Sequence, residues 1–331
     1  MKLFDCTLRD GANVVGKGFD AKLTKMMIEG LIKSGITTIE MGNALGLGAY
    51  EANGAIAPLT DEEYLQLIQP YLDQAEIGMF MGYKKGTQEN IDLAAKYGLK
   101  FLRVGANAGD GAEAIDAIKR VKAAGMKCYY SAMKAYIVTP DEMAAEAKML
   151  EEAGLDAITF MDSAGYTDPD MVKEYISKMC AAVKIPVAFH GHSNLGMSTA
   201  NAIAAVQAGA DIIDCGLLGM ARSAGNCSTE LVVFALDKKG YLPAEIKPYE
   251  LLDFLDRELI PAMAEYGYRT AVTPNDLIYG YAGCHSSFSK TLEAVAAEKG
   301  VHLYKLIVEV SKIDRKNPSR ELMEKVADSL K

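Results

Sequence analysis

The strongest constraint on the fold is an alternation of short apolar runs with longer amphipathic runs, repeated eight times along the chain. The short runs are typical of buried strands, and helical runs separate them, several ending at a glycine that suits a left-handed helix terminus. Strand–helix alternation implies parallel strands joined by right-handed crossovers. The expected strands are residues 2–6, 37–41, 77–81, 101–104, 128–132, 157–161, 186–190 and 212–215.

Eight such units in about 240 residues have the size of an α/β protein of the (β/α)8 TIM-barrel type. The alternative is an open doubly wound sheet, which would carry a glycine-rich phosphate turn after its first strand. The segment that follows the first strand here, TLRDG at 7–11, is not such a turn. The alternation stops after Tyr241, and the remainder reads as helical. We therefore expect a catalytic TIM barrel over residues 1–243 and a C-terminal α-helical extension over 244–331.

Composition and charge exclude several classes of function. Hydrophobic residues make up 50% of the chain and charged residues 24%, as in ordinary globular enzymes. The formal net charge is −9 and there is no long basic run, which argues against nucleic acid or an anionic membrane as a partner. No apolar stretch has the length of a membrane span, and the six cysteines are scattered. These features predict a cytoplasmic enzyme with reduced thiols.

Chemistry in a TIM barrel lies at the carboxyl ends of the strands. His190 and His192 stand at the end of the seventh expected strand, and residues two apart in an extended chain point to the same side. They can serve as two nitrogen ligands of one divalent metal, although the pair alone is equally compatible with a polar strand end. Further polar residues at these ends are Arg9, Asp10, Glu40, Arg103, Lys134, Ser163 and Asn226.

Three segments, in matching order, resemble the signatures of the DRE-TIM metallolyase superfamily. They are DCTLRDG at 5–11, HGHSNLG at 190–196 and GMARSAGN at 219–226. Within the superfamily the chain is most similar to the 4-hydroxy-2-oxovalerate aldolase family, which is related to the HMG-CoA lyases. YAGCHSSF at 281–288 also resembles a segment of that aldolase family, so the likeness spans nearly the whole chain.

The resemblance implies a metal-dependent aldolase that forms or cleaves an adduct between a 2-oxo acid enolate, such as that of pyruvate, and an aldehyde. Arg9 matches the arginine that stabilises the enolate oxygen, and Ser163 matches a residue near the pyruvate carboxylate. Arg103 and Glu40 are further candidates for substrate binding, unless Arg103 only neutralises a neighbouring carboxylate. The implied ligands of a Mn²⁺ or Mg²⁺ ion are Asp10, His190, His192 and, as in some relatives, Asn226.

Two positions depart from the aldolase pattern. Asn13 stands where the pattern has the histidine that acts as general base, and an asparagine cannot exchange a proton near neutral pH. His285 stands where the pattern has a tyrosine. The sequence therefore predicts that His285 or Lys134 transfers the proton, with Asn13 holding a water or a substrate hydroxyl, or else that the substrate and the reaction differ from those of the aldolases.

Two other functions are compatible with these residues. A Claisen-type synthase of the same superfamily would add acetyl-CoA to a 2-oxo acid with the same metal set, although no separate acyl-CoA-binding segment is evident. A non-catalytic descendant would instead bind a partner through its C-terminal region. The resemblance also implies an acylating aldehyde dehydrogenase as a partner for that region, or a homo-oligomer.

Overall fold

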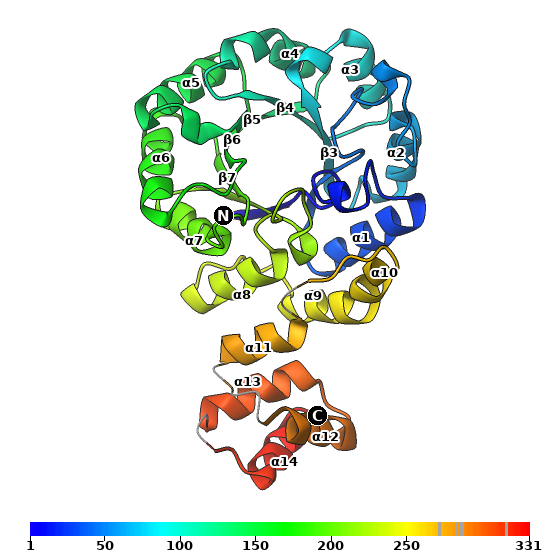
Figure 1. The fold of residues 1–331 in the computed structure, drawn as a ribbon, viewed down its shortest axis with the longest axis vertical. Helices are drawn as coiled ribbons and strands as arrows, with labels where there is room; N and C mark the ends of the chain where they lie inside the picture. Colours follow the sequence, from blue (N-terminus) through cyan, green and yellow to red (C-terminus); the bar gives the residue numbers. More distant parts are fainter. Residues whose placement is uncertain (271–272, 283, 285–287, 315–316) are drawn as a thin grey trace. The chain divides into compact units, whose positions relative to one another are not determined.

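The computed structural model describes residues 1–270, 273–282, 284, 288–314 and 317–331. These residues form two compact units, Met1–Lys247 and Pro248–Lys331. The first unit is a closed barrel of eight parallel strands in sequence order, which confirms the predicted TIM barrel (Figure 1). The strands are β1 Lys2–Asp5, β2 Thr38–Met41, β3 Glu76–Gly82, β4 Phe101–Asn107, β5 Lys127–Met133, β6 Ala157–Asp162, β7 Val187–Gly191 and β8 Ile212–Cys215.

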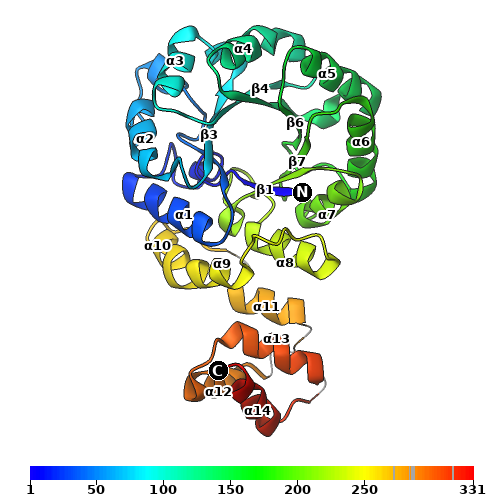
Figure 2. The same ribbon diagram turned by 180° about the vertical axis from the view of Figure 1, so that it is seen from behind.

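Eight α-helices follow the strands and surround the barrel, as Figures 1 and 2 show from opposite sides. Their starts are encoded locally: Thr60 and Thr139 each form a reciprocal capping box with a glutamate three residues later. The helices are α1 Ala21–Lys33, α2 Asp61–Leu67, α3 Gln88–Lys96, α4 Gly111–Ala123, α5 Pro140–Glu152, α6 Pro169–Ala182, α7 Ser198–Gln207 and α8 Thr229–Lys239.

The sequence pattern predicts one continuous helix over residues 61–72, but α2 covers only the first part of this range. It ends at Leu67, and a separate 3₁₀ turn follows at Gln69–Tyr71. Pro70 explains the difference, since its ring disfavours a helical conformation in the preceding residue and it has no N–H to donate.

Side chains fill the interior of the barrel toward the amino-terminal ends of its strands. Phe101 stacks on Tyr129 with ring centroids 4.7 Å apart, and Phe4 packs against both rings. Ala157 and Ala188 belong to the same buried cluster and leave room for these large neighbours. Because this core closes the barrel from within, reactive groups are confined to the rims.

The second unit consists of helices, as expected for the extension. Within it, α11 packs on α13, and α12 packs on both α13 and α14. Among the residues that the structure describes, no helix is both long and apolar enough to cross a membrane. The helices are α9 Pro248–Phe254, the π-helix η7 Leu255–Leu259, α10 Ile260–Ala264, α11 Pro274–Ala282, α12 Ser289–Lys299, α13 Leu303–Ile313 and α14 Arg320–Ser329.

Candidate active site

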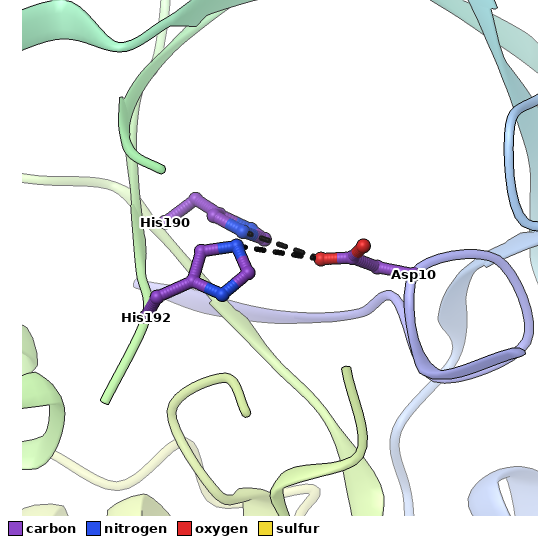
Figure 3. A group of neighbouring side chains, drawn as sticks. All are labelled: Asp10, His190 and His192. Carbon is purple, nitrogen blue, oxygen red and sulfur yellow. Dashed lines mark ion pairs between the residues drawn. The ribbon is translucent and has the colours of Figure 1, made fainter. Parts of the chain in front are cut away.

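Asp10, His190 and His192 converge at the carboxyl-terminal rim of the barrel. His190 lies near the end of β7 and His192 directly follows that strand, whereas Asp10 lies in the loop after β1. The Nε2 atoms of both histidines lie 3.7 Å from Oδ2 of Asp10, and all three side chains are buried (Figure 3). One ligand atom from each residue lies within 4.8 Å of the others. Two imidazole nitrogens and one carboxylate on one side of a site form a donor set that suits a divalent cation.

The orientation of His190 is fixed from behind by Asp214 on β8. The Nδ1 atom of His190 lies 3.1 Å from Oδ2 of Asp214, so a proton on Nδ1 is held by the carboxylate. Its Nε2 atom is buried and makes no hydrogen bond to a described residue. This pairing leaves the Nε2 lone pair available to a metal. The sequence analysis assigned no role to Asp214, although it stands at the end of a strand in the sequence pattern.

The protonation states of His192 and Asp10 also suit a metal. Burial, and then the charge of the neighbouring His190, lower the pKa of His192 to about 4. Burial alone would raise the pKa of the Asp10 carboxyl, but the charge of Arg9 and the two imidazoles outweigh it and lower that pKa. At neutral pH His192 is therefore neutral and Asp10 ionised, which are the forms that bind cations.

Asn226 lies beside this group. Its Nδ2 donates to Oδ2 of Asp10 at 3.0 Å and to the Cys6 sulfur at 3.4 Å. Its Oδ1 is buried without a hydrogen-bond partner in the described part of the chain. Direct ligation by Asn226 would require the amide to turn so that Oδ1, rather than Nδ2, faces Asp10.

Arg9 belongs to a buried ion network that runs behind the histidines. Nε of Arg9 and Nε of Arg103 each donate to one oxygen of Glu40 at 2.6 Å, and Nη1 of Arg103 pairs with Asp214. Burial would raise the pKa of Glu40, but the two arginines outweigh burial and lower it. Nη1 of Arg9 lies 3.2 Å from Oδ1 of Asp10, whereas its Nη2 is buried with no partner among the described residues. The network holds the guanidinium rigidly and leaves one donor for a ligand oxygen.

A cavity of about 360 Å³ opens over these groups. Ser163 and Lys134 line it, whereas Glu40, Arg103, Asn13 and Asn226 are not among its lining residues. Glu40 and Arg103, expected at the substrate, therefore contact the groups behind the pocket. The lining residues are Arg9, Asp10, Ala44, Leu45, Phe80, Met133, Lys134, Met161, Ser163, His190, His192 and Arg222.

The candidate proton-transfer residues occupy different positions. Lys134 lines the pocket in a left-handed backbone conformation (φ 55°, ψ 41°), and its backbone N–H donates to Oγ of Ser163 at 2.9 Å. Nδ2 of Asn13 donates to the backbone oxygen of Asp10 at 2.8 Å and to its Oδ1 at 3.3 Å. Asn13 thus braces the Asp10 loop. His285 lies outside the described residues.

The fold and the groups at the carboxyl-terminal rim define the class of protein: a TIM barrel with an Asp-His-His group beside a buried arginine. A family model described as HMGL-like matches residues 1–257, and the chain belongs to this family. It is 32% identical over 330 residues to the 4-hydroxy-2-oxovalerate aldolase of Carboxydothermus hydrogenoformans, covering 100% of this chain and 97% of the relative. The aldolase of the same name from Moorella thermoacetica is 35% identical over 287 residues, covering 86% and 83% of the two chains. The predicted family resemblance is confirmed.

Solved structures support the same fold. The HMG-CoA lyase of Bacillus subtilis superposes with a TM-score of 0.68 at 18% identity, covering 84% of this chain and 97% of the lyase. The carboxyl transferase domain of Rhizobium etli pyruvate carboxylase superposes with a TM-score of 0.69 at 16% identity, covering 100% and 61%. At this identity the likeness concerns the fold.

Proposed function

We propose that this chain is a divalent-metal-dependent carbon–carbon lyase that cleaves or forms a 4-hydroxy-2-oxo acid through the enolate of pyruvate. The observation that carries the proposal is the convergence of unsatisfied polar atoms on one site, namely Nη2 of Arg9 and Nε2 of His190 beside Asp10. The aldolase names of the curated relatives support the reaction class.

Asp10, His190 and His192 would hold the ion, for which Mn²⁺ or Mg²⁺ is our assignment, and Asn226 would join them after its amide turns. A bound divalent cation supplies Lewis-acid polarisation of the substrate keto oxygen. Arg9 contributes fixed positive charge where the enolate oxyanion develops, through the Nη2 donor that the ion network leaves unused. Glu40, Arg103 and Asp214 act as positioning residues.

Ser163 is assigned to the carboxylate of the 2-oxo acid. Its Oγ already accepts the Lys134 backbone N–H, so the hydroxyl proton remains available to donate into the pocket. The bond also couples Ser163 to the strained backbone at Lys134, which fixes the position of the hydroxyl.

Proton transfer is assigned to Lys134 or His285, because the amide of Asn13 cannot titrate. Lys134 is supported by its place on the pocket wall, and His285 by its sequence context. The pH profiles of K134A and H285A separate them. Only loss of the true base flattens the limb that depends on deprotonation.

The test is release of pyruvate from 4-hydroxy-2-oxopentanoate by protein stripped with a chelator and then supplied with Mn²⁺ or Mg²⁺. Metal-restored cleavage supports the lyase. Condensation that depends on acetyl-CoA would support the Claisen-type synthase instead, and a protein that retains no metal would support the non-catalytic binding descendant.

We also propose a cytoplasmic location, because the cysteines at 6, 128, 180, 215 and 227 are free thiols and that compartment keeps thiols reduced. An acylating aldehyde dehydrogenase, or a second copy of this chain, is the partner that we propose for the C-terminal helices. Size-exclusion chromatography of the chain alone and with such a dehydrogenase tests both partners.

A further inference from the structure

Arg222 is a pocket residue that the proposed mechanism does not use. It lies in the loop after β8 and lines the cavity with a side chain that is 53% exposed. Its guanidinium makes two long interactions: Nη2 lies 3.4 Å from Oδ1 of Asn13, and Nε lies 3.9 Å from Oδ1 of Asp10. Such distances leave most of its donors available to a ligand.

The pocket wall carries an excess of positive charge. Arg9, Lys134 and Arg222 line it, and Asp10 is the one acidic side chain among the lining residues. The carboxylate of Asp10 already pairs with Arg9 at 3.2 Å and lies beside the two histidines. No acidic side chain in the described residues forms an ion pair with Lys134. The pocket lining therefore carries a net positive charge before any metal binds, and a bound cation would add to this charge.

The loop that carries Arg222 is built to hold a fixed shape. Ser223 adopts a left-handed conformation (φ 60°) that a non-glycine residue rarely takes. Its Oγ accepts from Nδ2 of Asn194 at 2.6 Å, and the backbone N–H of Ser193 donates to the oxygen of Gly225 at 2.8 Å. These bonds tie the loop to the segment that follows β7. Backbone strain held in place by such contacts is typical of ligand-binding loops.

We propose that Arg222 binds an anionic group, a carboxylate or a phosphate, at the aldehyde end of the substrate. The inference rests on the proposed function and names its acceptor class. The carboxylate of the 2-oxo acid is assigned to Ser163 beside the metal group, so a neutral aldehyde would leave Arg222 with only its long contact to Asp10 as a counter-charge. A guanidinium fork matches the geometry of either oxyanion.

The test compares matched aldehydes in condensation with pyruvate: glyceraldehyde against glyceraldehyde 3-phosphate, and butanal against succinic semialdehyde. We expect the wild type to prefer an anionic member, and the preferred pair distinguishes phosphate from carboxylate. R222Q should lower the anionic-to-neutral ratio of kcat/KM roughly 10- to 100-fold, as for loss of a charge-assisted hydrogen bond. The control R120Q removes the same charge from α4, outside the pocket, and should leave the ratio unchanged.

An R222Q variant that loses activity equally on charged and neutral aldehydes would overturn the proposal, because Arg222 would then act only through Asp10. Binding of unreactive analogues, measured by calorimetry, decides the matter even if no condensation occurs. We expect glycerol 3-phosphate to bind better than glycerol, or 4-hydroxybutanoate better than butanol, and R222Q to abolish the difference. Equal binding of charged and neutral analogues by the wild type contradicts the proposal, whereas absence of condensation contradicts only the aldolase function.

Discussion

The two ends of the barrel differ in how completely their charged and polar side chains are paired. At the amino-terminal end Glu76 accepts hydrogen bonds from Nζ of Lys2 at 2.5 Å, from Nζ of Lys127 at 2.7 Å and from the Tyr129 hydroxyl at 2.8 Å. Burial would raise the pKa of Glu76, but these three donors outweigh it and lower the pKa to about 2. Every charge in this cluster has a protein partner.

The carboxyl-terminal end also contains a dense ion network but leaves buried atoms unsatisfied. Nη2 of Arg9, Nε2 of His190, Nδ1 of His192 and Oδ1 of Asn226 make no hydrogen bond within the described residues. A buried polar atom without a partner costs about 1–3 kcal/mol. The difference indicates that one end is organised for stability, whereas the other gives up stability to keep donors and acceptors available for a ligand.

The largest effect should come from removing a metal ligand. H192A deletes one of the two imidazole nitrogens that face Asp10, so we expect loss of bound metal and of detectable turnover while the barrel stays folded. Metal content by mass spectrometry and circular dichroism check this outcome. H302A is the matched control, because His302 pairs with Asp253 in the second unit. Full metal occupancy in H192A would remove His192 from the site.

Arg9 tests whether the unsatisfied donor acts on the transition state. R9K keeps the charge but loses the planar fork that both pairs with Glu40 and presents Nη2. We expect kcat to fall on the order of a hundredfold or more, as for loss of one oxyanion donor. Unchanged turnover would mean that Arg9 only neutralises Glu40 and Asp10.

Asp214 tests the comparison between the paired and the unpaired end of the barrel. Its carboxylate pairs with Nδ1 of His190, whereas Nε2 of the same ring has no hydrogen-bond partner among the described residues. D214N should weaken metal affinity by roughly 10- to 100-fold, the usual cost of losing the carboxylate behind a ligating histidine. Metal titration calorimetry measures the loss. An affinity equal to that of the wild type would show that Asp214 serves only the Arg103 pair.

The smallest expected effect comes from a substitution at the amino-terminal end of the barrel, and it concerns stability. Because the folded pKa of Glu76 is lowered from 4.5 to about 2, its pairs stabilise the fold above the unfolded value and cease to do so as pH falls through the folded value. E76Q should cost about 1 kcal/mol at pH 7, a modest figure because both lysines are partly exposed to solvent. The difference in denaturant unfolding between E76Q and wild type should shrink below about pH 4.5. A constant difference at all pH values would argue against an electrostatic origin.

The fold was predictable from sequence because strand–helix periodicity is a local property that repeats. The sequence also predicted which residues lie close together at the rim. Parallel strands bring their carboxyl ends together, so Asp10 was expected near His190 and His192. The direction of individual side chains did not follow. The sequence placed Glu40 and Arg103 near strand ends, but β4 continues to Asn107 and both side chains contact the groups behind the pocket, which depends on strand length, register and packing. Arg222 lies in a segment that the sequence singled out, but only the loop conformation shows that its side chain lines the pocket.

The most direct measurement of the central claim is exchange of the pyruvate methyl protons in deuterated water, followed by NMR without any aldehyde. It isolates enolate formation from the choice of acceptor. If the unsatisfied atoms at the carboxyl-terminal end form a metal–enolate site, exchange occurs with Mn²⁺ or Mg²⁺, stops on chelation and is absent in H192A. Exchange that persists in H192A or without metal would contradict the account.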